Sequence, residues 1–170
     1  MSDTEITALA PMGMITLRGD LETLGRAVEA VTACPLPDRR LSTAAGAHRV
    51  LWMSPDELML LTGYDEAPAL AASLTNALAA EFATVAVVSD ARAVFDITGP
   101  GARQVITSLA PVDLRALAET EVRRTRLAQI PAAFWRTGDG FRLICFRSVA
   151  KYAEDVLRNA AGTHPMVQGA

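Results

Sequence analysis

Hydrophobic and polar positions alternate most clearly in the middle of the chain. Residues 84–88 and 93–98 place apolar side chains in alternation, a pattern typical of half-buried strands. Gly99-Pro100-Gly101 then ends the second strand, since glycine permits a sharp corner and the fixed φ of proline suits the start of a helix. Apolar residues at helical spacing follow over 102–109, and Pro111 ends them. The pattern predicts two strands, a corner and a helix.

Similar patterns predict strands elsewhere in the chain. They are expected at 12–18, 47–53, 57–63, 121–129, 132–136 and 140–146, with a linker or an irregular edge strand over 38–46. Ser54-Pro55-Asp56 lies between two of these strands, and with Glu57 it also fits a helix capping box. We favour a hairpin turn, because proline suits the second position of a type I turn and strands flank it on both sides.

Three further helices are predicted from their starts and apolar faces. Asp20 and Ser148 precede two of them, and each side chain can accept a hydrogen bond from the first helical amides. Asp65 opens the third, whose apolar face is expected to extend from Leu70 to Phe82.

The order of these elements repeats after about 80 residues. Leu17 and Gly19 correspond to Ile97 and Gly99, and the run from Trp52 to Leu61 corresponds to the run from Trp135 to Ile144. Each half contains a strand, a helix, an extended linker, a hairpin and a helix, and neither half can bury its apolar faces alone.

We therefore predict an α+β fold with internally duplicated mixed sheets and packed helices. The expected boundaries are a single domain over 12–164, halves at about 12–82 and 84–161, and tails at 1–11 and 165–170.

Composition narrows the range of partners. A net charge of −3 and an aromatic content of 5% give no reason to expect nucleic acid or an anionic membrane surface. The longest uncharged apolar stretch, 67–80, is too short to span a bilayer. Cys34 and Cys145 lie far apart and read as buried reduced thiols, and the acidic N-terminal residues lack the features of a signal peptide. We expect a cytoplasmic protein.

The residues that could carry catalysis are few. His48 and His164 are the only histidines and have no nearby cluster of ligands, so no metal site is expected. The glycines at 99 and 101 lack the third glycine of a dinucleotide loop, and no serine lies in a nucleophile elbow. We accordingly predict no catalytic, cofactor-binding or metal-binding residue in this chain.

Three polar or aromatic features have two interpretations each. Ser89-Asp90-Ala91-Arg92 is either a turn with a local ion pair or a functional feature, namely a partner contact or a remnant ligand pocket. Arg123, Arg124 and Arg126 form either a solvated strand edge or a site for acidic groups of a protein or a polyglutamate tail. Trp52 and Trp135 occupy matching places in the repeat, either as core anchors or as hot spots of a subunit interface.

Several of these segments resemble one protein family. The order W-x-x-P-D-E-x-x-L-L from Trp52, then Ser89-Asp90-Ala91-Arg92-Ala93, then the Gly99-Pro100 corner, and then Pro111 to Leu114 resembles the gamma subunit of heterotetrameric sarcosine oxidase. That family is similar in turn to the folate-binding domain of glycine-cleavage aminomethyltransferases, which are internally duplicated.

The resemblance implies a function as an accessory subunit. The family enzyme oxidises sarcosine to glycine, with hydrogen peroxide and, from tetrahydrofolate, 5,10-methylenetetrahydrofolate as products. Flavins, NAD and tetrahydrofolate are then expected on the large alpha and beta subunits, which would be the partners of this chain. Where aminomethyltransferases carry a carboxylate for the folate amine, residues 128–134 contain none, so the isolated chain is expected to be inactive. The alternative is a stand-alone folate-binding one-carbon protein.

Overall fold

The computed structural model describes residues 4–162, which form two compact units. The 11–90 unit comprises Pro11–Asp90 and the short segment Thr120–Val122. The 91–162 unit comprises the described residues of Met1–Ala10, Ala91–Glu119 and Arg123–Ala170.

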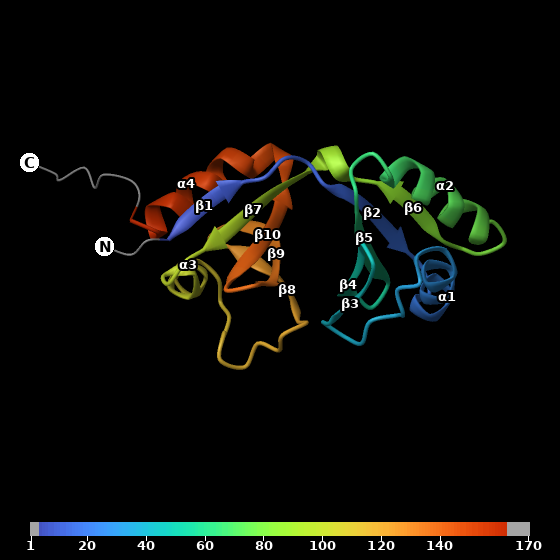
Figure 1. Ribbon diagram of the computed structural model, residues 1–170, viewed down its shortest axis with the longest axis horizontal. Helices are drawn as coiled ribbons and strands as arrows, with labels where there is room; N and C mark the ends of the chain where they lie inside the picture. Colours follow the sequence, from blue (N-terminus) through green and yellow to red (C-terminus); the bar gives the residue numbers. More distant parts are fainter. Residues whose placement is uncertain (1–3, 163–170) are drawn as a thin grey trace, which may run out of the picture. The chain divides into compact units, whose positions relative to one another are not determined.

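Each unit contains a five-stranded sheet and two helices (Figure 1). The 11–90 unit has β2 (Gly13–Arg18), α1 (Leu21–Thr32), β3 (Ser42–Ala45), β4 (His48–Ser54), β5 (Glu57–Thr62), α2 (Ala67–Ala77) and β6 (Thr84–Val87). The 91–162 unit has β1 (Glu5–Ala8), β7 (Arg92–Thr98), α3 (Ala102–Leu109), β8 (Val122–Leu127), β9 (Ile130–Thr137), β10 (Gly140–Phe146) and α4 (Ala150–Ala160). Two short 3-10 helices, η1 (Ser89–Ala91) and η2 (Arg147–Val149), precede β7 and α4.

The two sheets have the same topology, which confirms the α+β fold and supports the internal duplication. Their strand orders are β6-β2-β5-β4-β3 and β1-β7-β10-β9-β8, so each strand of one sheet has a counterpart in the other. The strand pairs with a defined register are all antiparallel, where we had expected mixed sheets.

With β1 included, one repeat extends from β1 to α2 and the other from β6 to α4. The first strand of each repeat pairs with the second strand of the other repeat. β1 precedes β2 in the chain but pairs with β7, and β6 precedes β7 but pairs with β2. Thr7 lies opposite Asp96 in the first ladder, and Ala86 lies opposite Thr16 in the second. The two repeats have therefore exchanged their first strands.

Helices pack on one face of each sheet and form a separate core in each unit. In the 11–90 unit, Leu24 and Val28 of α1 and Leu74 of α2 pack with sheet residues such as Leu58. In the 91–162 unit, the corresponding core is built from these residues: Val105 and Ile106 of α3, Ala153 and Leu157 of α4, and Phe95, Phe134, Phe141 and Leu143 of the sheet. The rings of Phe134 and Phe141 meet edge to face, with centroids 5.9 Å apart.

Two predicted local features are wrong. Phe82 is fully exposed, because α2 ends at Ala77 and the chain turns before it reaches Phe82. Ser148 does not cap α4, because a 3-10 turn intervenes and Val149 occupies the N-cap position without a side-chain hydrogen bond.

The expected loose tail over 1–11 is also wrong for residues 5–8. They form β1, whose Ile6 is buried, and the single buried residue of this short strand left no alternating pattern to detect. The predicted tail at 165–170 lies outside the described residues, and the boundaries of a single domain over 12–164 stay a prediction. No helix within residues 4–162 is long and apolar enough to cross a membrane.

Asp20 caps α1 as predicted, and this gives a pH-dependent contribution to stability. Its carboxylate accepts a hydrogen bond of 2.9 Å from the Thr23 amide, and this contact holds the pKa of Asp20 below its usual value. A carboxyl whose pKa is lower in the folded chain stabilises the fold at pH values above the pKa of the unfolded state. The contribution is lost as the pH falls through the folded-state pKa.

We expect Asp20→Ala to lower the melting temperature of the full chain at neutral pH and to lose this effect progressively as the pH falls below about 4. Thermal melts of the wild type and the variant across pH 3 to 8 would measure the difference, with Asp65→Ala as the control for one lost negative charge. A difference that stays constant on acidification would contradict the assignment.

Candidate functional site

His48, the histidine among the described residues, belongs to a row of hydrogen-bonded side chains between the start of β4 and the end of β5. The His48 Nδ1 atom lies 3.0 Å from Thr62 Oγ1, and the Thr62 hydroxyl donates to Glu66 Oε2 over 2.9 Å. No three histidine, cysteine, aspartate or glutamate residues gather as metal ligands within residues 4–162. His164 lies outside this range. The expectation that the chain lacks catalytic, cofactor-binding and metal-binding residues stays a prediction.

The two cysteines are buried free thiols. Burial raises the pKa of the Cys145 thiol, which keeps its reactive thiolate form scarce. The Cys34 thiol contacts the carbonyl oxygen of His48 at 3.5 Å. Both residues pack as small apolar side chains, in line with the sequence.

The segment from Ser89 to Arg92 mainly shapes the local fold. The buried Ser89 hydroxyl accepts a hydrogen bond from the Met14 amide, and Asp90 accepts one from the Tyr64 hydroxyl at 2.8 Å. The Arg92 guanidinium lies 4.1 Å from the centroid of the Phe146 ring. These contacts favour the turn over the partner contact.

The predicted basic run occupies an edge strand. Arg123, Arg124 and Arg126 lie on β8, which ends its sheet, and Arg124 and Arg126 are exposed on one face. Positive charge on an edge strand discourages pairing with other chains. The position therefore supports the interpretation as a solvated strand edge.

The two tryptophans do not occupy equivalent places. Trp52 lies opposite Leu58, whereas Trp135 lies opposite Arg142, because the β4–β5 ladder shifts register between Trp52 and Ser54. Counted outward from the hairpin, this extra residue of β4 places Trp52 on the other face from the one that Trp135 occupies. Trp52 consequently packs beside the helix-covered core, and Trp135, only 3% exposed, faces away from the helices of its unit.

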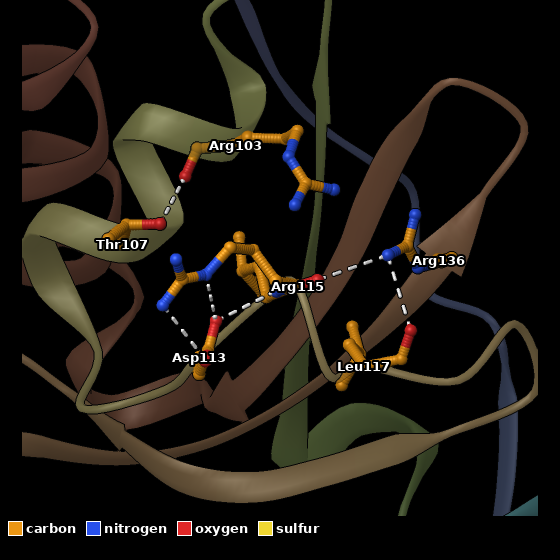
Figure 2. A network of polar contacts seen from close by, with 7 residues as sticks. Arg103, Thr107, Asp113, Arg115, Leu117 and Arg136 are labelled. Carbon is orange, nitrogen blue, oxygen red and sulfur yellow. Dashed lines mark hydrogen bonds and ion pairs between the residues drawn. The ribbon is translucent and has the colours of Figure 1, made fainter.

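An arginine network that the sequence analysis missed lies beside α3 (Figure 2). Arg136 of β9 donates two hydrogen bonds, each of 3.3 Å, to the carbonyl oxygens of Leu114 and Leu117. Both leucines are buried in the core of the 91–162 unit, so the arginine holds their connecting loop over the sheet. By register Arg136 lies opposite Phe141, and it thus takes the place that Trp52 has in the other repeat.

Exposed charged side chains lie near the hydrogen bonds of Arg136. Arg115 pairs with Asp113 at 3.2 Å, and Figure 2 shows the Arg103 side chain reaching from α3 over this pair. Hydrogen bonds from Arg115 hold the pKa of Asp113 below its usual value. Because the pair is highly exposed, it adds little to stability. No signal in the sequence joins these residues, since they come from three separate segments.

A second arginine pair joins two strands of the same unit. Arg142 of β10 binds Asp96 of β7 through two hydrogen bonds of 2.7 Å each, and this contact raises the pKa of the guanidinium. Asp96 and Arg142 are cross-strand neighbours, so the bidentate pair fixes the register of the ladder.

A long surface segment with a single charged side chain lies in the 11–90 unit. Residues 67–89 carry a single charged side chain, Glu81, and most of their side chains outside the core are exposed. Phe82 is fully exposed and Val87 is 44% exposed. Exposed apolar side chains are a common feature of protein contact sites. Among the described residues, this segment is the strongest candidate for a partner-binding site.

Arg136→Met is expected to destabilise the full chain by about 1–3 kcal/mol, because two loop carbonyls lose their charged donor. Urea denaturation would measure this loss. Arg103→Met is the matched control, since this exposed arginine of α3 makes no hydrogen bond to a described residue through its guanidinium. Equal midpoints for the two variants would show that Arg136 does not clamp the loop.

Comparisons of the sequence and of the structure with known proteins point to the same family. The chain is 32% identical over 137 residues to the sarcosine oxidase subunit gamma of an Arthrobacter species. That match covers 79% of this chain and 66% of the relative, so the chain spans about two thirds of the relative's length. No family model matches the sequence.

Solved structures show the same fold. A chain of the heterotetrameric sarcosine oxidase from Corynebacterium sp. U-96, in complex with pyrrole 2-carboxylate, superposes with a TM-score of 0.86 and 28% identity, over 98% of this chain and 88% of that one. The glycine cleavage system aminomethyltransferase T from Bartonella henselae gives a TM-score of 0.70 at 17% identity, over 92% of this chain and 46% of that chain, and so shares the fold. Since the sequence match and the structural match agree, the chain belongs to the family of sarcosine oxidase gamma subunits.

Proposed function

We propose that this chain is an accessory, non-catalytic subunit of a heterotetrameric sarcosine oxidase. The observation that carries the proposal is the match to the Corynebacterium oxidase, which extends over 98% of this chain. The absence of a carboxylate from residues 128–134 supports a non-catalytic role. Its work is then to bind the larger subunits and to stabilise them.

The chemistry belongs to the assembly. The complex oxidises sarcosine to glycine, with hydrogen peroxide and 5,10-methylenetetrahydrofolate as products. Flavins, NAD and tetrahydrofolate bind to the large alpha and beta subunits, and this chain holds none of them. We place the assembly in the cytoplasm, and the two buried free thiols of this chain support a reducing compartment.

The fold of aminomethyltransferase T raises one further possibility. That likeness, at 17% identity, reports a shared fold and carries no folate site to this chain. Segment 128–134, where a carboxylate would be needed, contains none. A stand-alone folate-binding one-carbon protein therefore ranks second.

The proposal predicts the behaviour of the chain in its own cells. A tagged copy, purified from a native extract, should bring down larger subunits that carry flavin absorbance and produce hydrogen peroxide from sarcosine. The chain purified alone should be colourless and inactive, because its role is to bind and stabilise subunits that hold the flavins.

The control is an untagged extract passed over the same resin. A tagged chain that purifies without a flavoprotein would contradict the accessory role, and tetrahydrofolate binding by that lone chain in calorimetry would favour the second candidate.

A further inference from the structure

The four outer strands of the two sheets differ in how their open edges are protected. β1 and β8 end one sheet, and β3 and β6 end the other. An open edge presents unpaired backbone amides and carbonyls, and natural proteins block it with charged side chains or by covering it.

Three of these edges have such protection. β8 carries three arginines, and β1 begins with the exposed Glu5. The start of β3 is covered by segment 120–122, since the Ser42 amide donates to the Thr120 carbonyl and the Val122 amide donates to the Arg40 carbonyl, each over 2.8 Å.

β6 has no charged side chain, and no described strand pairs with its outer edge. Its four residues, Thr-Val-Ala-Val, include no charged side chain, and Thr84, Ala86 and Val87 are exposed. The Val88 amide donates to the Met14 carbonyl, so the alternation of an antiparallel ladder directs the backbone groups of Ala86 toward β2. The amides and carbonyls of Val85 and Val87 then point outward.

The residues around β6 are also mostly uncharged. Phe82 projects fully into solvent two residues before the strand, and α2, which contacts β6 in the same unit, bears no charged side chain. An exposed aromatic residue beside an apolar surface is the usual composition of an interface centre.

We infer that the outer edge of β6 binds an extended, uncharged strand of a partner subunit of the oxidase, with Phe82 as the side-chain anchor. The inference rests on the proposed function, which supplies the partner. The outward amides and carbonyls of Val85 and Val87 specify a strand as the occupant, because another strand offers its own amides and carbonyls at the same spacing. Because β6 offers no charged side chain as a pairing partner, the strand that fits it best is also uncharged.

The exchanged repeat provides a matched control. β1 pairs with β7 as β6 pairs with β2, and the Leu9 amide donates to the Val94 carbonyl as the Val88 amide donates to the Met14 carbonyl. Ala8 therefore occupies the place on β1 that Val87 occupies on β6, and both are exposed.

The test compares Val87→Lys with Ala8→Lys in chains co-expressed with the larger subunits that the wild type captures. A lysine on a strand edge opposes pairing, so we expect Val87→Lys to reduce incorporation into the flavoprotein by about tenfold or more. Ala8→Lys should incorporate as the wild type does. Melting temperatures of the free variants establish that both still fold.

Hydrogen exchange on the wild-type chain provides an independent measurement. The outward amides of Val85 and Val87 should exchange at least about tenfold more slowly in the assembly than in the free chain, while the outward amides of Ile6 and Ala8 should keep their rates.

Equal incorporation of both lysine variants, or unchanged exchange at Val85 and Val87 in an assembly that forms, would overturn the β6 site and leave the accessory role standing. A wild-type chain that captures no flavoprotein would overturn both. Slower exchange that depends on the concentration of the chain alone, with a dimer in light scattering, would show that a second copy occupies the edge and would also overturn the inference.

Discussion

The exchange of first strands between the two repeats is the constraint on which the rest of the structure depends. Each sheet has four strands from one repeat, and its fifth strand comes from the other through the β1–β7 and β6–β2 ladders. Without β1, its neighbour β7 would become the outer strand of the sheet, and without β6 the same would hold for β2. The backbone groups of β7 and β2 that now pair with β1 and β6 would then be unpaired, so neither repeat forms its complete sheet alone.

The same exchange explains why the two repeats can differ in their surfaces. Strand pairing and the helix-covered cores use equivalent positions in both units, such as Leu58 and Phe141. Positions outside these cores are free to diverge. The register shift beside Trp52 places a tryptophan where the other repeat has Arg136, and this arginine then holds the loop of Leu114 and Leu117. A duplicated fold with unequal surfaces suits a subunit that binds its partners through one repeat.

Much of the fold could be predicted because its strands and helices have regular apolar patterns. The hairpin around Pro55, the cap at Asp20 and the correspondence of the two repeats all follow from local spacing. β1 could not be predicted in this way, because its one buried side chain, Ile6, gives no period. The tryptophans looked equivalent because an irregularity in a ladder leaves no mark on sequence spacing.

The candidate site was less predictable than the fold. Arg103, Arg115 and Arg136 come together only through tertiary folding. Arg136 binds backbone carbonyl oxygens, which every residue has, so the residue types give no sign of this contact. Phe82 was assigned to a helix face, although its exposure is the feature that marks the uncharged surface. The sequence motifs of the family are structural, so they identified the fold and the family rather than the contact residues.

Native mass spectrometry of the assembly purified through a tag on this chain tests the central claim most directly. The account predicts a complex that contains this 18.1 kDa chain together with larger subunits and bound flavin. A species whose mass equals this chain alone, or a multiple of it, would contradict the assignment as an accessory subunit.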